Sequence, residues 1–251
     1  MPTTCCENRE GLKMTVSVCI ATYNGEKFIG EQLLSIIEQI PGDSEIIIVD
    51  DCSTDKTLFV IKQLRDYRIR IYYNPSRQGP VKTFERAIKL SRGDYIFLSD
   101  QDDVWVHSKI RLMKECLSHY DLVVSDAILI DDKGSIINDS FYKLRNSGPG
   151  LLKNLYKNTY LGCCMAFNRK ILEKSLPFPA AVPMHDMWLG MIAELYGTAY
   201  FCNEKLIYYR RHPANTSPAG EKSSYSMYAK LKFRYNLLYE LSKRYIQIHK
   251  V

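Results

Sequence analysis

The sequence predicts an α/β fold built around a mostly parallel sheet with helices on both sides. Strand patterns alternate with helix patterns through the first 126 residues. Two of the strand patterns, EIIIV and YIFLS, are almost wholly apolar, as expected for strands that helices cover on both faces. Hydrophobic residues make up 46% of the 251 residues and charged residues 25%, which is ordinary globular usage and argues against a disordered or collagen-like chain.

The first half contains five strand patterns in succession. The first, residues 15–23, is rich in β-branched residues and stops at the turn pair Asn24–Gly25. Apolar residues then recur at three- and four-residue steps up to Ile40, which predicts a helix that ends before Pro41. Strands are also predicted at 45–51, 69–73, 95–99 and 121–126, and helices up to about 66, from about 80, and over about 108–119. This series predicts an open parallel sheet with right-handed crossovers.

The second half is organised differently. The turn residues 132–134 predict a hairpin. We then expect a strand at 162–168, a helix at 187–196 and one or two short strands within 199–209. A long amphipathic helix is predicted from about residue 223 to the end. Its exposed face should carry Lys230, Lys232, Arg234, Lys243 and Arg244. We expect an extension at 1–13, one domain at 14–220 with halves at about 14–126 and 127–220, and a C-terminal helix within 221–251.

Charge, apolar stretches and cysteine spacing limit the possible cell compartments and partners. The net charge of +6 favours anionic ligands or an anionic lipid surface, without the dense basic arm of a nucleic-acid binder. No apolar stretch approaches the roughly 20 residues that cross a bilayer, and the start lacks the apolar core of a signal peptide, so we expect a cytoplasmic protein. The eight cysteines show no CxxC spacing for zinc, which favours free thiols.

Two acidic clusters follow predicted strands. Asp50 and Asp51 come after EIIIV, and Asp100, Asp102 and Asp103 come after YIFLS. Ligands of open α/β sheets bind at the carboxyl ends of the strands, so these carboxylates should converge on one crevice. Their mutual repulsion calls for a cation, and Mg²⁺ or Mn²⁺ with a phosphorylated ligand fits best. The simpler alternative is that the acids cap the following turns, but a turn needs one Asp rather than three.

Two phosphate-binding motifs are absent from the sequence. No GxGxxG follows the first strand, and no GxxxxGK[ST] occurs. The phosphates are therefore not expected to lie on a glycine-rich helix start, as they do in dinucleotide-binding and P-loop folds. A metal ion is the expected substitute.

Four segments in order resemble the inverting glycosyltransferases of family 2. They are SVCIATYNGEKFIGEQLLSIIEQ, IIIVDDCSTDKT, the turn at 77–79 and GDYIFLSDQDDVW, with looser likeness in LGCCMAFNR, MHDMWL and YYRRHPANTS. The SDQDDVW and YRRHPANTS forms resemble bacterial enzymes that build surface polysaccharide, of the rhamnosyltransferase-like type. The resemblance implies a GT-A fold, with a Rossmann-like sheet in the nucleotide-sugar half, a smaller mixed acceptor half and a C-terminal helix.

The resemblance implies a set of donor-binding residues. Tyr23 would cover the base, unless it is a core tyrosine, and Asp51 would accept the imino N–H of uracil or thymine. Asp102 would bind the metal, and Asp100 the ribose or a metal-bound water. His212 matches a late histidine that binds metal or diphosphate, with a solvated loop histidine as the alternative. The remaining nucleotide-sugar contacts implied are Ala21, Asn24, Arg77, Gln101 and Arg211. Arg210 and Arg211 could face the phosphates, since planar forked donors suit them, or be plain surface arginines.

Asp186 matches the family position of the catalytic base. Inverting displacement needs a base that removes the proton of the acceptor hydroxyl. The alternative is that Asp186 is the N-cap of the following helix, which would lower its pKa. His185 stands where the family often has an acidic residue before the base. It could either orient Asp186 or contact the acceptor.

The function implied is metal-dependent transfer of a sugar, with inversion, from a UDP- or dTDP-sugar to a hydroxyl of a growing surface glycan such as O-antigen or capsule. dTDP-rhamnose is one candidate donor. A non-catalytic nucleotide-sugar-binding protein and a phospho-receiver-like signalling protein are the alternatives. The basic C-terminal helix could lie on the inner face of the cell membrane, near a lipid-linked acceptor, or simply close the domain.

Overall fold

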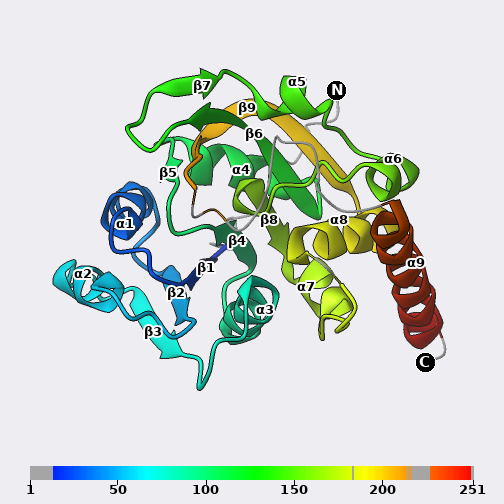
Figure 1. Cartoon of the computed structure of the whole chain (residues 1–251), viewed down its shortest axis with the longest axis horizontal. Coiled ribbons are helices and arrows are strands. Elements are labelled where there is room, and N and C mark those ends of the chain that lie inside the picture. The colour runs from blue at the N-terminus through cyan, green and yellow to red at the C-terminus, as the bar shows by residue number, and fades with distance from the viewer. Residues whose placement is uncertain (1–13, 183, 214, 216–226, 250–251) are drawn as a thin grey trace, which may run out of the picture.

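The computed structural model describes residues 14–182, 184–213, 215 and 227–249. The expected extension at 1–13 lies outside these residues. Nine strands form a single sheet with the order β3-β2-β1-β4-β8-β6-β9-β5, and β7 pairs with β6 (Figure 1). The predicted α/β class is confirmed.

The first half forms the parallel part of the sheet. Its strands are β1 (Val16–Thr22), β2 (Glu45–Asp50), β3 (Ile69–Tyr73) and β4 (Tyr95–Ser99). The connecting helices are α1 (Ile29–Ile37), α2 (Thr57–Gln63) and α3 (Pro80–Leu90). Every residue of β2 and β4 is buried, as their apolar runs predict. These parallel strands bring the residues that follow β1, β2 and β4 to one edge of the sheet.

The parallel series stops at β4, which corrects the sequence prediction. β6 (Leu122–Ile130) does not lie beside β4, because β8 (Met165–Asn168) inserts between them and runs antiparallel to both. The predicted strand at 162–168 accordingly begins as a 3₁₀ turn, η1 (Gly162–Cys164). A short apolar run is compatible with either strand direction, so local pattern could not choose between them.

The rest of the second half builds the mixed part of the sheet. β9 (Ala199–Arg210) is one long strand parallel to β6, and β5 (Val104–Trp105) pairs with it. β7 (Ile136–Asn138) forms the predicted hairpin with β6. The remaining helices before the C-terminal one are α4 (Lys109–Leu117), α5 (Phe141–Arg145), α6 (Leu151–Tyr156), α7 (Arg169–Ser175) and α8 (His185–Tyr196).

The C-terminal helix α9 (Met227–His249) packs beside α8, far from β3 (Figure 1). Its apolar side is buried through Leu237 and Leu241. Arg244 was predicted on the exposed face but is buried: its guanidinium donates hydrogen bonds to the carbonyls of residues 174, 176 and 177. Arg234 is likewise half-buried and donates to the carbonyls of residues 155 and 156. Lys232 and Lys243 are exposed as predicted, and the side chain of Lys230 lies outside the described part of the structure.

Candidate functional site

A cavity of about 680 Å³ opens at the carboxyl ends of β1, β2 and β4. The starts of α3 and α8 and the segment after β9 complete its walls. The predicted site residues that line it are Ala21, Tyr23, Asn24, Asp51, Arg77, Asp100, Gln101, Asp102, Asp186 and His212. The fold thus brings residues from both halves of the chain to one cavity.

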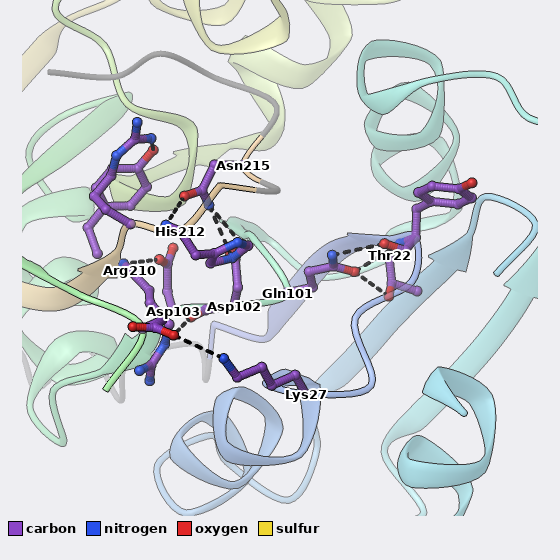
Figure 2. A network of polar contacts seen from close by, with 12 residues as sticks. Thr22, Lys27, Gln101, Asp102, Asp103, Arg210, His212 and Asn215 are labelled. Atoms are coloured by element: carbon purple, nitrogen blue, oxygen red, sulfur yellow. Dashed lines mark hydrogen bonds and ion pairs between the residues drawn. The ribbon is translucent and has the colours of Figure 1, made fainter. Parts of the chain in front are cut away.

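Gln101 joins the end of β1 to the acidic loop after β4. Its side-chain oxygen accepts hydrogen bonds from the Thr22 hydroxyl at 2.7 Å and the Tyr23 N–H at 2.9 Å, and its amide donates to the Tyr23 carbonyl at 3.0 Å (Figure 2). A Cβ at Gly25 would collide with this amide, so a side chain there would force Gln101 to shift. Gln101 lies on the cavity wall as predicted, but β1 already occupies most of its hydrogen-bonding capacity.

Asp51 is almost fully buried and organises the turn before α3. One oxygen accepts hydrogen bonds from the Asn74 amide and the Gln78 N–H, both at 2.7 Å, and the other accepts from the Gly79 N–H at 2.8 Å. Burial alone would raise the pKa of Asp51, but these hydrogen bonds outweigh it and hold the pKa below its usual value. Asp51 is therefore an anion that faces the cavity.

Tyr23 and Asn24 shape the same end of the cavity. The Tyr23 ring is partly exposed, so it is not a core tyrosine, and the Arg77 guanidinium lies 4.0 Å from its centroid. Asn24 has a positive φ of 49° and accepts a hydrogen bond from the Thr54 N–H at 2.8 Å, which ties the two strand-end loops together. Asp50 accepts from the Ser53 N–H, which fits its predicted turn-capping role.

The acidic loop after β4 concentrates negative charge. Burial, with the nearby charges of Asp102 and Asp186, raises the pKa of Asp100 to about 7. Burial, with the charges of Asp102 and Asp100, also raises the pKa of Asp103 well above its usual value. Asp100, Asp103 and Cys163 offer ligand atoms within 4.8 Å of one another. These carboxyls are therefore poorly compensated and suited to a cation.

Lys109 is a buried cation beside this cluster that sequence reasoning missed. It is 0% exposed, donates a hydrogen bond to the Cys163 carbonyl at 2.6 Å, and lies 4.3 Å from the centroid of the Trp105 ring. Burial lowers the pKa of Lys109, while the charges of Asp103 and Asp100 oppose that shift. A lysine on an otherwise ordinary amphipathic helix gives no local signal of such a role.

Asp102 is held by the segment after β9. His212 Nε2 lies 2.8 Å from Asp102 Oδ2, and the Asn215 amide donates to the same oxygen at 3.0 Å (Figure 2). The His212 ring stacks on Phe28 at 5.0 Å. Asn215 was not predicted, although it stands in the same RRHPANTS segment as His212.

The two arginines before His212 do not line the cavity within the described structure. Arg210 is buried: it donates to the Asp102 carbonyl at 2.9 Å and to Glu31 at 2.7 Å, and its backbone N–H donates to Asp103. Its guanidinium holds the acidic loop through the hydrogen bond to the Asp102 carbonyl and does not line the cavity. Arg211 lies beside Tyr209, with its N–H bonded to the Ile130 carbonyl. Contacts of Arg210 and Arg211 with phosphate stay a prediction.

Asp186 lies at the start of α8, within the cavity wall. The N-cap position belongs to Met184, so Asp186 sits in the first turn and is not the N-cap. It accepts a hydrogen bond from the Met187 N–H at 2.6 Å. Burial raises the pKa of Asp186 to about 6, although the N–H groups of Met187 and Gly162 oppose the shift. A carboxylate with this pKa is largely ionised near neutral pH and is basic enough to accept a proton.

Comparisons with known proteins identify the family of this chain. Residues 17–176 match the family model described as glycosyl transferase family 2. The dTDP-rhamnosyl transferase RfbG of Shigella flexneri is 32% identical over 214 residues, which cover 78% of this chain and 72% of that protein.

Two solved structures are similar in fold. The complex of Staphylococcus aureus TarS 1–349 with UDP-GlcNAc superposes with a TM-score of 0.67 at 21% identity, covering 93% of this chain and 73% of that one. The mannosyltransferase PcManGT of Pyrobaculum calidifontis, in complex with GDP-Man and Mn²⁺, gives a TM-score of 0.60 at 20% identity, covering 81% of this chain and 58% of that one. The chain therefore belongs to glycosyl transferase family 2 and is a glycosyltransferase of the GT-A fold.

Proposed function

We propose that this enzyme transfers a sugar, with inversion, from a UDP- or dTDP-linked donor to a hydroxyl of a growing bacterial surface glycan. The observation that carries the proposal is the meeting of Asp51, Asp102 and Asp186 in one cavity. RfbG is named for dTDP-rhamnose, so dTDP-rhamnose is our leading candidate donor.

The nucleoside binds at the Asp51 end of the cavity. The Asp51 carboxylate accepts hydrogen bonds from Asn74, Gln78 and Gly79, and the Thr83 hydroxyl also helps to lower its pKa. Oδ2 takes only one of the three bonds, so it is the oxygen that we assign to the imino N–H of uracil or thymine. The Tyr23 ring, with Arg77 beside it, supplies a flat surface for the base.

A divalent cation, Mg²⁺ or Mn²⁺, is held by Asp102 and His212, with Asp100 beside them. These three residues line the cavity, whereas Asp103 and Cys163 are not among the described residues that line it. Asp103 and Cys163 also lie near the cation Lys109, whereas Asp102 faces the cavity. When bound, such an ion offsets the negative charge of the departing nucleoside diphosphate. Arg210 and Asn215 fix the loop that presents Asp102.

Asp186 removes the proton of the attacking acceptor hydroxyl. Asp186 lines the cavity from the start of α8, in the second half of the chain, which suits a base that acts on the acceptor. This arrangement supports our division of the domain: residues 14–126 carry the donor contacts around Asp51, and residues 127–220 carry Asp186 and the acceptor side.

Nucleotide titration tests the proposal directly. In calorimetry with UDP, dTDP and GDP, we expect the protein to bind UDP or dTDP more tightly when Mn²⁺ is present than when the metal is chelated. Asp51→Asn should weaken binding about 10-fold, because an amide presents an N–H to the imino N–H where the carboxylate accepted it. Glu26→Gln, an exposed acid outside the cavity, is the matched control.

Two results, one from the titration and one from a labelling experiment, would count against the proposal. Absence of binding for all three nucleotides would reject a UDP- or dTDP-linked donor and favour the non-catalytic alternative. Phosphoryl-donor labelling at Asp50 or Asp51 would instead favour the phospho-receiver alternative. The two aspartates are only 2% and 4% exposed, so we expect no labelling.

We also propose that α9 holds the enzyme on the inner face of the cell membrane. No helix in the described ranges has the length and apolarity needed to span a bilayer, so the contact would be peripheral. Exposed apolar side chains run along α9 at helical spacing: Leu231, Tyr235, Leu238, Tyr239, Tyr245 and Ile246. Exposed Lys232 and Lys243 lie on the same helix. Apolar and aromatic residues with flanking lysines are typical of helices that lie on anionic lipid.

Vesicle flotation tests the membrane contact. The protein should float with vesicles that contain phosphatidylglycerol, and less well as salt rises, because salt screens the lysines. Leu231→Ser combined with Leu238→Ser should reduce recovery about 10-fold or more, since each buried leucine contributes about 1.5–3 kcal/mol. The matched control is Ile136→Ser with Ile137→Ser, two exposed isoleucines of β7. Equal recovery of both double variants would remove the membrane role of α9.

A further inference from the structure

Lys109 is a buried cation whose position is costly in two ways. It is the first residue of α4, where a positive charge opposes the helix dipole, and it is 0% exposed. A buried charge destabilises a fold unless it is paired or hydrogen-bonded. Lys109 is not among the described residues that line the cavity, so we look for its role in its contacts with the protein.

The Lys109 ammonium holds the 3₁₀ turn η1 in place. It donates a hydrogen bond of 2.6 Å to the Cys163 carbonyl, 54 residues away along the chain. Burial raises the pKa of both Asp100 and Asp103, and the Cys163 thiol opposes this shift as a hydrogen-bond donor. The positive charge of Lys109 lies near the same two carboxyls. Lys109 and Cys163 thus tie η1 to the acidic loop after β4.

The same turn contacts the proposed base. The Gly162 N–H donates a hydrogen bond to Asp186, and a Cβ added at Gly162 would lie 3.6 Å from the Asp186 Cβ. The Met187 N–H, in the same helix as Asp186, donates to it at 2.6 Å. His185 does not orient the carboxylate, because neither of its ring nitrogens has a hydrogen-bond partner in the described structure. Gly162 therefore fixes Asp186 relative to a segment outside α8.

We infer that Lys109 is a positioning residue for the base: it fixes η1, and η1 fixes the Asp186 carboxylate relative to the acidic loop. The inference rests on the proposed role of Asp186 and adds to it a residue that touches no substrate. Displacing a reacting group by about 1 Å can lower a rate about 100-fold, so the turn that holds the base needs a firm anchor. Lysine suits this task because its side chain reaches from α4 to Cys163 and its charge is offset by the acidic loop.

A double-mutant cycle with Lys109→Met and Asp186→Asn tests the inference. Methionine keeps an apolar chain of similar length and removes the charge and the hydrogen bond. Replacing a buried ion by an apolar residue is often neutral for stability, and Lys109→Leu repeats the cycle should Lys109→Met fail to fold. Transfer is measured from UDP-glucose, UDP-GlcNAc and dTDP-rhamnose to water and to a panel of nitrophenyl glycosides. Calorimetry with UDP, dTDP and Mn²⁺ measures binding, and Tm measures folding.

Three results are expected if Lys109 acts through Asp186. Lys109→Met lowers turnover about 10- to 100-fold when Asp186 is present, while affinities for nucleotide and Mn²⁺ stay within about threefold. In the Asp186→Asn background the same change costs less than about threefold, because no base remains to be positioned. Lys109→Gln, which keeps an N–H donor for the Cys163 carbonyl, recovers part of the loss.

Lys114→Met is the matched control for these measurements. Lys114 is another lysine of α4, donates a hydrogen bond to the Met14 carbonyl, and is not among the described residues that line the cavity. We expect this variant to keep full activity.

Other results overturn the inference. Equal losses of turnover from Lys109→Met in the two backgrounds would mean that Lys109 acts independently of the base, through the fold or the acidic loop. Turnover within about twofold of the wild type would mean that the anchor is dispensable. In both cases the proposed function stands if Asp186→Asn alone is inactive. If Asp186→Asn is as active as the wild type, or the wild type transfers no sugar, the inference falls together with the proposed role of Asp186.

Discussion

Replacing Asp186 by Asn is expected to lower turnover about 10²- to 10⁴-fold, the usual contribution of a positioned general base. Nucleotide affinity should stay near the wild-type value, because Asp186 makes none of the proposed contacts to the nucleotide. The measurement is sugar transfer alongside calorimetry with UDP or dTDP. Asp139→Asn, an acid with 65% of its side chain exposed and no place in the cavity, is the control and should be fully active.

Stability and pH dependence separate a base from a structural acid. Because the folded-state pKa of Asp186 is raised to about 6, its ionisation destabilises the fold as pH rises from about 4 to about 6. Asp186→Asn removes that burden, so Tm at neutral pH should hold or rise while turnover falls. In the wild type, kcat/KM should rise with pH through an apparent pKa near 6. A flat profile, or a variant that loses activity by unfolding, would contradict the assignment.

Replacing Asp102 by Asn should abolish the metal dependence of donor binding and lower turnover about 10²- to 10³-fold. A metal ion contributes several kcal/mol to stabilising a departing diphosphate, and the amide loses the charge that holds the ion. Mn²⁺ titration by electron paramagnetic resonance measures the ion itself. His212→Gln should weaken Mn²⁺ binding less, since the Asp102 charge remains.

The same experiment distinguishes the proposed ligands Asp102 and His212 from Asp103 and Cys163, which also lie near Asp100. Cys163→Ser serves as the matched variant, because Cys163 does not line the cavity within the described structure. We expect it to retain metal-dependent binding. Should Cys163→Ser lose Mn²⁺ and Asp102→Asn keep it, the ion belongs to the group of Asp100, Asp103 and Cys163, and our placement is wrong.

The strands and helices of the first half can be predicted from the residue pattern within each segment. Apolar runs and helical spacing predict β1 to β4 and α1 to α3, because the spacing of apolar residues shows which side of each strand or helix is buried. The sequence also predicts the place of the cavity, since residues after parallel strands must meet at one edge of the sheet. Asp51 and Asp102 accordingly line one cavity, as their places after β2 and β4 predict.

Contacts between segments far apart in the sequence could not be predicted and are seen in the tertiary structure alone. His212 reaches Asp102 across 110 residues of chain, and no local pattern states which residue of RRHPANTS faces inward. Arg210 points behind the loop while His212 points at Asp102. The insertion of β8 between β4 and β6 depends on pairing free energies between strands, which strand periodicity does not encode. Buried Lys109, His185 and Arg244 are charged or polar residues whose partners, or lack of them, appear only when the fold closes around them.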